Sequence, residues 1–208
     1  MNQILAWTRA ERLGLADLLD DLDGDEWQAA SLCGGWTMHH VAAHVTTSTR
    51  TTLLDAIRGA IRARGSFDRM TDLEARDLAA RYTPAQLVAR LRETAGSDRR
   101  APGAGPLDPL VDALVHGQDV ARPLGRVREM PVAPAVAALD HVLASRFYGA
   151  RRRFRGVRLV ATDADWSAGA GADEVRGPVG DLLLVATGRP AGLRALSGPG
   201  AERVAAAT

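Results

Sequence analysis

Two stretches of the chain carry imidazole and carboxylate groups at helical spacing. His40 and His44 are four residues apart in one predicted helix, and Asp112 and His116 are four residues apart in another. Each pair would therefore share a helix face. Imidazole nitrogens and carboxylate oxygens bind divalent metal ions. The spacing also fits two plainer interpretations: exposed histidines, and an Asp–His hydrogen bond without a metal.

The residues around the second pair favour a buried site. Apart from Asp112, His116 and Asp119, the segment 110–119 is mostly apolar and should point inward. Buried carboxylates and imidazoles must be paired or coordinated to offset the loss of water. A metal ion held between two helices would meet that requirement, and helical bundles build sites in this way.

Hydrophobic periodicity and capping signals predict a mainly helical chain. Thr37 is a suitable N-cap, and the sequence from Thr83 to Gln86 forms a capping box with proline at the first helical position. The charged, weakly periodic residues 65–82 are expected to form a loop with a short helical turn. We predict helices over residues 3–23, 37–63, 83–96, 107–122 and 133–150.

The pattern changes after the arginine run at 151–155. Residues 157–162 alternate as a strand does, residues 173–179 suggest a second strand, and residues 180–188 suggest a short helix. We therefore predict two domains, a helical metal-binding domain over 1–150 and a small α+β domain over 156–208.

Composition narrows the possible functions. The chain has 208 residues, 46% of them hydrophobic, and a formal net charge of +1. Its basic residues are spread along the chain, so no nucleic-acid partner is expected. All of them are arginine, which excludes a lysine Schiff base. The single cysteine, Cys33, suits a reducing compartment, and no signal peptide or apolar run of about 20 residues is present. We expect a cytoplasmic protein without membrane segments.

The stretch from Leu32 to His44 resembles the N-terminal signature of the mycothiol-dependent maleylpyruvate isomerase family, part of the DinB-like superfamily of helical-bundle metalloproteins. Trp36 and His44 match the tryptophan of that signature and the ligand histidine eight residues later. The segment 112–125 resembles the family's second ligand helix. The C-terminal region is similar at residues 161–166, 176–184 and 188–189, so the resemblance covers nearly the whole chain. It implies a DinB-like four-helix bundle with a small C-terminal α+β domain.

The resemblance also implies a metal site. The family's ligands are His, Glu and His, which correspond here to His44, Asp112 and His116. Aspartate is one methylene shorter than glutamate, so the helices approach more closely, a water bridges the gap, or metal affinity falls. Three ligands with an open position suit catalytic Zn²⁺, and the same set accepts Ni²⁺, Fe²⁺ or Co²⁺. Asp119 is predicted to orient His116 through its other ring nitrogen.

The implied chemistry is thiol activation. A divalent metal would lower the pKa of the thiol of mycothiol, which would then isomerise an electrophilic small molecule or displace a leaving group from it. Arg189 is the predicted match to an active-site arginine of the C-terminal domain, holding a substrate carboxylate. Two alternatives remain open: a metal- or ligand-binding bundle without turnover, and a hydrolase that activates water. Either a monomer or a homodimer is expected.

The other candidate residues are assigned structural roles. His39 and His141 are expected on the surface, and His40 is not expected to be a ligand. Cys33 lies near a helix start, but its predicted role is structural. The four tryptophans, Trp7, Trp27, Trp36 and Trp166, are predicted to pack in the core or between domains.

Overall fold

The computed structural model describes residues 3–208, and its contacts divide the chain into two compact units, residues 1–128 and 129–208. The first unit contains α1 (Gln3–Asp20), α2 (Gly24–Gln28), α3 (Met38–Val45), η1 (Thr47–Thr49), α4 (Leu53–Arg62), α5 (Phe67–Arg81), α6 (Pro84–Thr94), α7 (Asp108–Ala121) and η2 (Arg122–Leu124). The second contains α8 (Val132–Ala144), α9 (Ala150–Arg153), β1 (Val157–Ala161), β2 (Ser167–Ala168), β3 (Asp173–Gly177), α10 (Val179–Ala186), η3 (Pro190–Ala195) and α11 (Ala201–Ala206).

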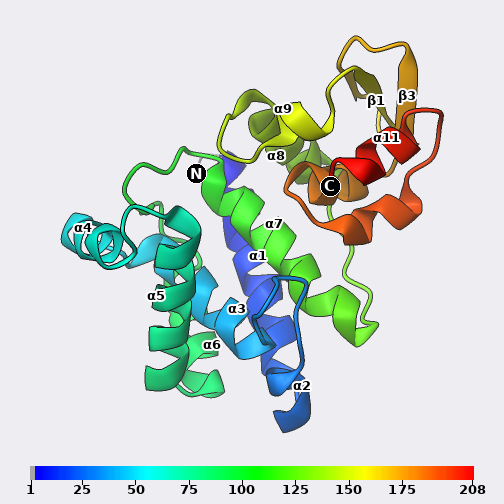
Figure 1. The fold of residues 1–208 in the computed structure, drawn as a ribbon. Helices are drawn as coiled ribbons and strands as arrows, with labels where there is room; N and C mark the ends of the chain where they lie inside the picture. Colours follow the sequence, from blue (N-terminus) through cyan, green and yellow to red (C-terminus); the bar gives the residue numbers. More distant parts are fainter. Residues whose placement is uncertain (1–2) are drawn as a thin grey trace. The chain divides into compact units, whose positions relative to one another are not determined.

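Four helices form the bundle of the first unit. Both α1 and α3 contact α6 and α7, so the four enclose one core (Figure 1). The buried side chains of this core include Leu15, Leu19, Trp27, Met38, Val41, Leu87, Leu91 and Val120. The mainly helical, four-helix prediction is confirmed. Because α3 and α7 pack against each other, the helix that carries His44 and the helix that carries Asp112 and His116 border the same core.

The predicted continuous helix over residues 37–63 is wrong, because the chain is helical there in three separate pieces. Positions 46–52 hold six serine and threonine residues and one arginine, Arg50. The Thr46 hydroxyl donates to the carbonyl of Ala43, and the Thr51 hydroxyl donates to that of Thr47. Such local bonds compete with the helix. Thr52 then caps α4.

The predicted loop over residues 65–82 is also wrong, because most of it is the fifteen-residue helix α5. Ser66 caps this helix by accepting a hydrogen bond from the backbone nitrogen of Arg69. Only Ala75 is fully buried on α5, so the apolar periodicity is weak. Contact with α3 and the Asp72–Arg76 ion pair stabilise the helix instead.

Other element boundaries differ by smaller amounts. The first predicted helix ends at Asp20, and α2 follows as a separate turn with a capping box from Asp23. The capping box at Thr83 is present. The predicted helix 133–150 ends at Ala144, and α9 begins only at Ala150.

The second unit is built around a three-stranded sheet of order β2–β1–β3. Strand β1 is antiparallel to β2 and parallel to β3, with Leu159 opposite Val175. Helix α10 follows β3 directly and is buried along almost its whole length. Both α8 and η3 pack against α10. The predicted strands and the short apolar helix are therefore all present.

The contacts group α8 with the sheet, although the sequence assigned residues 133–150 to the helical domain. The assignment of independent domains to 1–150 and 156–208 stays a prediction. Within residues 3–208, no helix combines the length and the apolar character that crossing a membrane requires.

Candidate metal centre

Three predicted ligands converge between α3 and α7. His44 lies in the last turn of α3, and Asp112 and His116 lie one turn apart on α7. One ligand atom from each lies within 4.8 Å of the other two. The side chains of His44 and Asp112 remain 18% and 25% exposed, so the cluster is accessible to solvent.

Distances within the cluster bear on whether the shorter carboxylate of Asp112 could reach a metal ion. Oδ1 of Asp112 lies 3.4 Å from Nε2 of His44 and 3.3 Å from Nε2 of His116. Ligand atoms about 2.0–2.1 Å from a tetrahedral Zn²⁺ are separated by roughly 3.3–3.4 Å. These separations are compatible with direct coordination by all three residues, and equally with Asp–His hydrogen bonds, so coordination by Asp112 stays a prediction.

Charges within the cluster are strongly coupled. Burial alone would raise the pKa of Asp112, but the charge and hydrogen bonds of His116, and then of His44, hold it well below its usual range. Burial would lower the pKa of His116, yet Asp112, Asp119 and Cys33 together raise it well above its ordinary value. The two carboxylates thus favour the protonated form of His116, and a metal ion bound at Nε2 would compete with a proton there.

A second carboxylate fixes the ring of His116. Oδ2 of Asp119, whose side chain is fully buried, lies 2.8 Å from Nδ1 of His116. With Nδ1 donating to Asp119, Nε2 points toward Asp112, which is the arrangement predicted for an orienting group.

Cys33 belongs to the same cluster, which the sequence did not predict. Its thiol donates to Oδ2 of Asp119 at 3.1 Å, and Sγ lies 3.7 Å from Nδ1 of His116. Cys33, His116 and Asp119 form a second group with ligand atoms within 4.8 Å of one another. A metal here would need Nδ1 of His116, whereas one at the first group would use Nε2. The only sequence signal was the position of Cys33 inside the stretch that ends at His44.

Arg12 is a further residue that the sequence did not single out. Its side chain is buried, and the guanidinium donates to backbone carbonyls, including that of Ser97 at 3.1 Å, and to the hydroxyl of Ser48. Burial lowers the pKa of Arg12, and the negative charge of Asp112 opposes that shift. Arg12 thus places a positive charge near the carboxylate.

Trp36 contacts the cluster from the loop before α3. Its ring lies 5.3 Å from that of His44, and its indole nitrogen donates to Asp72 of α5. Asp72 also accepts from Arg76, which in turn donates to the carbonyl of Gly35. Trp36 therefore holds one side of His44 and is more than core packing.

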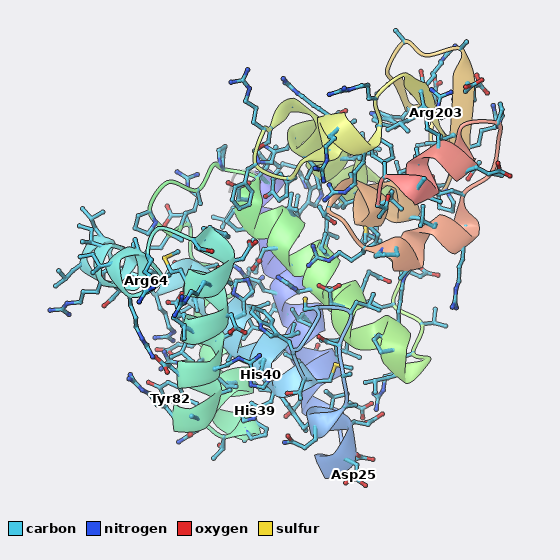
Figure 2. All side chains as sticks on the ribbon, viewed as in Figure 1. Asp25, His39, His40, Arg64, Tyr82 and Arg203 are labelled. Atoms are coloured by element: carbon cyan, nitrogen blue, oxygen red, sulfur yellow. The ribbon has the colours of Figure 1, made fainter. Side chains whose placement is uncertain are left out.

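The remaining histidines have other partners. The backbone nitrogen of Thr37 donates to Nδ1 of His40, so His40 completes a capping box at the start of α3, where Figure 2 labels it beside His39. His39 contacts the carbonyl of Tyr82 and the ring of Trp27. His141 lies in the second unit.

Arg189 also lies in the second unit, just before η3, where its guanidinium donates to the carbonyl of Thr187. The structure brings together His44, Asp112, His116 and Asp119. The assignment of Arg189 to the same site stays a prediction.

Comparison with known proteins identifies the family. Residues 8–132 match the sequence profile described as "Mycothiol maleylpyruvate isomerase N-terminal domain", which covers more than half of the chain. The chain belongs to the mycothiol maleylpyruvate isomerase family. All four clustered residues lie inside the matched region.

Solved structures agree with this family fold. The chain is similar to the crystal structure of the mycothiol-dependent maleylpyruvate isomerase, with 15% identity and a TM-score of 0.64 over 95% of this chain and 92% of that one. A histidine-to-alanine variant of the same enzyme matches with 14% identity, a TM-score of 0.64 and the same coverage. No curated protein sequence matches significantly. The fold of this chain is therefore the DinB-like fold of the maleylpyruvate isomerase.

Proposed function

We propose that the chain is a metal-dependent enzyme that uses mycothiol as its thiol cofactor. His44, Asp112 and His116 would hold the divalent ion, with Zn²⁺ the first choice because two imidazoles and one carboxylate leave a fourth position open. The observation that carries this proposal is the convergence of Asp112 on both histidine Nε2 atoms at 3.3–3.4 Å, in a chain of this family.

A divalent ion bound there supplies a Lewis acid that lowers the pKa of a thiol. The protein's own residues prepare the site. Asp119 holds the tautomer of His116 that presents Nε2, Trp36 restricts the ring of His44, and Arg12 balances the charge of Asp112. An electrophilic small molecule meeting the activated thiol would undergo cis–trans isomerisation or S-transfer.

The proposal assigns Arg189 to the substrate. A guanidinium binds a carboxylate through two parallel hydrogen bonds, which an ammonium group cannot reproduce. Arg189→Lys should therefore raise KM for a carboxylate-bearing substrate by roughly 10-fold. The same variant should leave metal content unchanged, which separates this role from that of the metal ligands.

Metal analysis of protein purified without chelator tests the first step. Wild type should carry close to one divalent ion per chain, and both His44→Ala and His116→Ala should carry none above background. His40→Ala is the matched control, because His40 lies on the same helix but is occupied with the capping box. Equal trace metal in all four proteins would contradict the metal site.

Activity measurements test the second step. Isomerisation of maleylpyruvate in the presence of mycothiol, and consumption of mycothiol with a panel of electrophiles, should each require both the metal and His116. Turnover without any thiol would instead identify a hydrolase that activates water. Metal binding without turnover of any kind would identify a binding module.

A further inference from the structure

A second cleft in the first unit is lined by residues that the metal centre does not use. It has a volume of about 450 Å³ and lies between α4 and α5, bounded by the segment after α3 and by Arg90 of α6. Figure 2 labels Arg64, in the turn between α4 and α5, and Tyr82, which follows the last residue of α5. Among the residues that line it, none is His44, Asp112 or His116.

Positive charge exceeds negative charge in this cleft. Its lining includes five arginines, Arg50, Arg58, Arg62, Arg81 and Arg90, and three carboxylates, Asp55, Glu74 and Asp77. Each carboxylate already has a partner within the protein. Asp55 accepts from Thr52, Glu74 accepts from the hydroxyl of Thr51, and Asp77 is paired with Arg62. Arg50 is also paired, with Glu93 outside the lining, so among residues 3–208 the lining arginines without an ion pair to a carboxylate are Arg58, Arg81 and Arg90.

Two arginine nitrogens identify where an acceptor is missing. Within residues 3–208, Nε of Arg50 and Nε of Arg90 are the buried side-chain atoms recorded without a hydrogen-bond partner. Nη2 of Arg50 donates a hydrogen bond to Glu93, and the Arg90 guanidinium lies 4.1 Å from the ring centre of Tyr82. A buried N–H without an acceptor is unfavourable, and such atoms in folded proteins call for an explanation. Because less than 1 Å² of either Nε atom is accessible, a ligand in the cleft would contact the other nitrogens of these guanidinium groups.

The rest of the lining is apolar. Ala56, Met70, Leu73 and Leu78 contribute carbon surface beside the arginines. A volume of about 450 Å³ falls within the range of small-molecule sites, which combine apolar walls with a few fixed polar groups. The cleft thus suits a molecule with an anionic head and an apolar body.

We propose that this cleft binds a small amphiphilic oxyanion, a carboxylate or phosphate on an apolar body. Its oxygen atoms would accept hydrogen bonds from the guanidinium groups that line the cleft, among them those of Arg50 and Arg90, and its body would lie against Met70 and Leu73. The site is independent of the metal centre and does not rest on the proposed enzymatic function.

Isothermal titration of the full, metal-free chain tests the proposal with four probes. Octanoate and octyl phosphate each combine an anionic head group with an apolar chain, and the one that binds more tightly identifies the preferred head group. Inorganic phosphate lacks the apolar body and should bind at least 10-fold more weakly. Octylammonium has the same body with the opposite charge and should not bind.

Substitutions locate the binding. The double variant Arg50→Gln with Arg90→Gln should lose at least 10-fold in affinity for the better probe. Arg100→Gln, at an exposed arginine outside the cleft, is the matched control and should bind as wild type. If the double variant does not fold, Arg90→Lys keeps the charge, removes the planar guanidinium group and should still lose several-fold in affinity.

Three results would overturn the proposal: no saturable binding by either amphiphile, full affinity in the Arg50 and Arg90 variants, or equal binding of octylammonium. His116→Ala should bind the probes as wild type does. A failure of the metal proposal would therefore leave this result unaffected, and the reverse also holds.

Discussion

The helix pairs α3–α7 and α4–α5 differ in how far their charged side chains are paired within the protein. Between α3 and α7, the protein supplies the acceptors itself, because Asp112 and Asp119 accept on both sides of His116. Between α4 and α5, arginines outnumber carboxylates, and two of their nitrogens are buried without acceptors. Burial differs as well. Most of α7 is buried, whereas none of the ten residues of α4 is.

This difference separates two routes to a binding site. In our proposals, the inner pair fixes its polar groups in advance, so that an ion would replace a proton. The outer pair has arginine charge in excess, so that the ligand would supply the acceptors. Variants that affect one pair and spare the other therefore test the distinction.

The same substitution in the two regions should give the largest contrast in stability. Leu114 of α7 is 1% exposed and Leu54 of α4 is 55% exposed. Leu114→Ala should lower the free energy of unfolding by about 2–5 kcal/mol, because it leaves a cavity in the core. Leu54→Ala should change it by about 0.5 kcal/mol or less. Urea denaturation measures both, and a large effect at Leu54 would mean that another molecule or segment covers α4.

Removing the carboxylate ligand should abolish most metal binding. Asp112→Ala should weaken Zn²⁺ affinity by roughly 100-fold or more, beyond the loss typical of an outer orienting group. Asp112→Glu should give no gain, because the helix spacing already fits the shorter side chain. Competition with a chromophoric chelator measures these affinities, with exposed Asp98→Ala as control. Tighter binding by the glutamate variant would show that the spacing does not suit aspartate.

The orienting carboxylate should matter more than the thiol beside it. Asp119→Asn should weaken metal binding by about 10- to 100-fold. Cys33→Ser keeps a donor to Asp119 and should cost less than about 3-fold. If Cys33→Ser weakened metal binding more than Asp119→Asn, the ion would instead be assigned to the group formed by Cys33, His116 and Asp119.

The pH dependence of the metal-free protein should reveal the charged pair. Because Asp112 raises the pKa of His116 above its ordinary 6.5, the folded state binds that proton more tightly than the unfolded state. The resulting stability is complete below pH 6.5 and is lost as pH rises through the raised pKa, by about 1.4 kcal/mol per pH unit within that window. Urea unfolding between pH 5.5 and 8.5 with chelator present measures it.

Two comparisons control the pH experiment. His116→Gln should remove this decline. Metal-loaded wild type should show the opposite trend, since the ion displaces the proton and binds better at high pH. A decline that persists in the glutamine variant would assign the titration to another group.

Much of the bundle and the ligand set could be predicted, because both depend on local spacing. The interval from Asp112 to His116 fixes a shared helix face, and family resemblance joins it to His44. The break after Val45 and the helix α5 were missed for a common reason. Hydroxyl bonds to backbone carbonyls interrupt one helix, and ion pairs with little burial sustain the other, so apolar periodicity reports neither.

Contacts between residues far apart in the chain also could not be predicted from the sequence. Cys33 and Asp119 are 86 residues apart, and Arg12 approaches Asp112 from a different helix. No spacing rule connects such positions, since only the packing of α1, α3 and α7 brings them together.

The position of Cys33 has a practical consequence for spectroscopy. It is the one cysteine in the chain, it is half-buried, and its sulfur lies 3.7 Å from a ring nitrogen of His116. A thiol-directed spin label or fluorophore would attach at this position alone, next to the candidate metal centre and without prior mutagenesis. For the same reason, alkylating or mercurial reagents used during purification would modify the region whose metal content is to be measured.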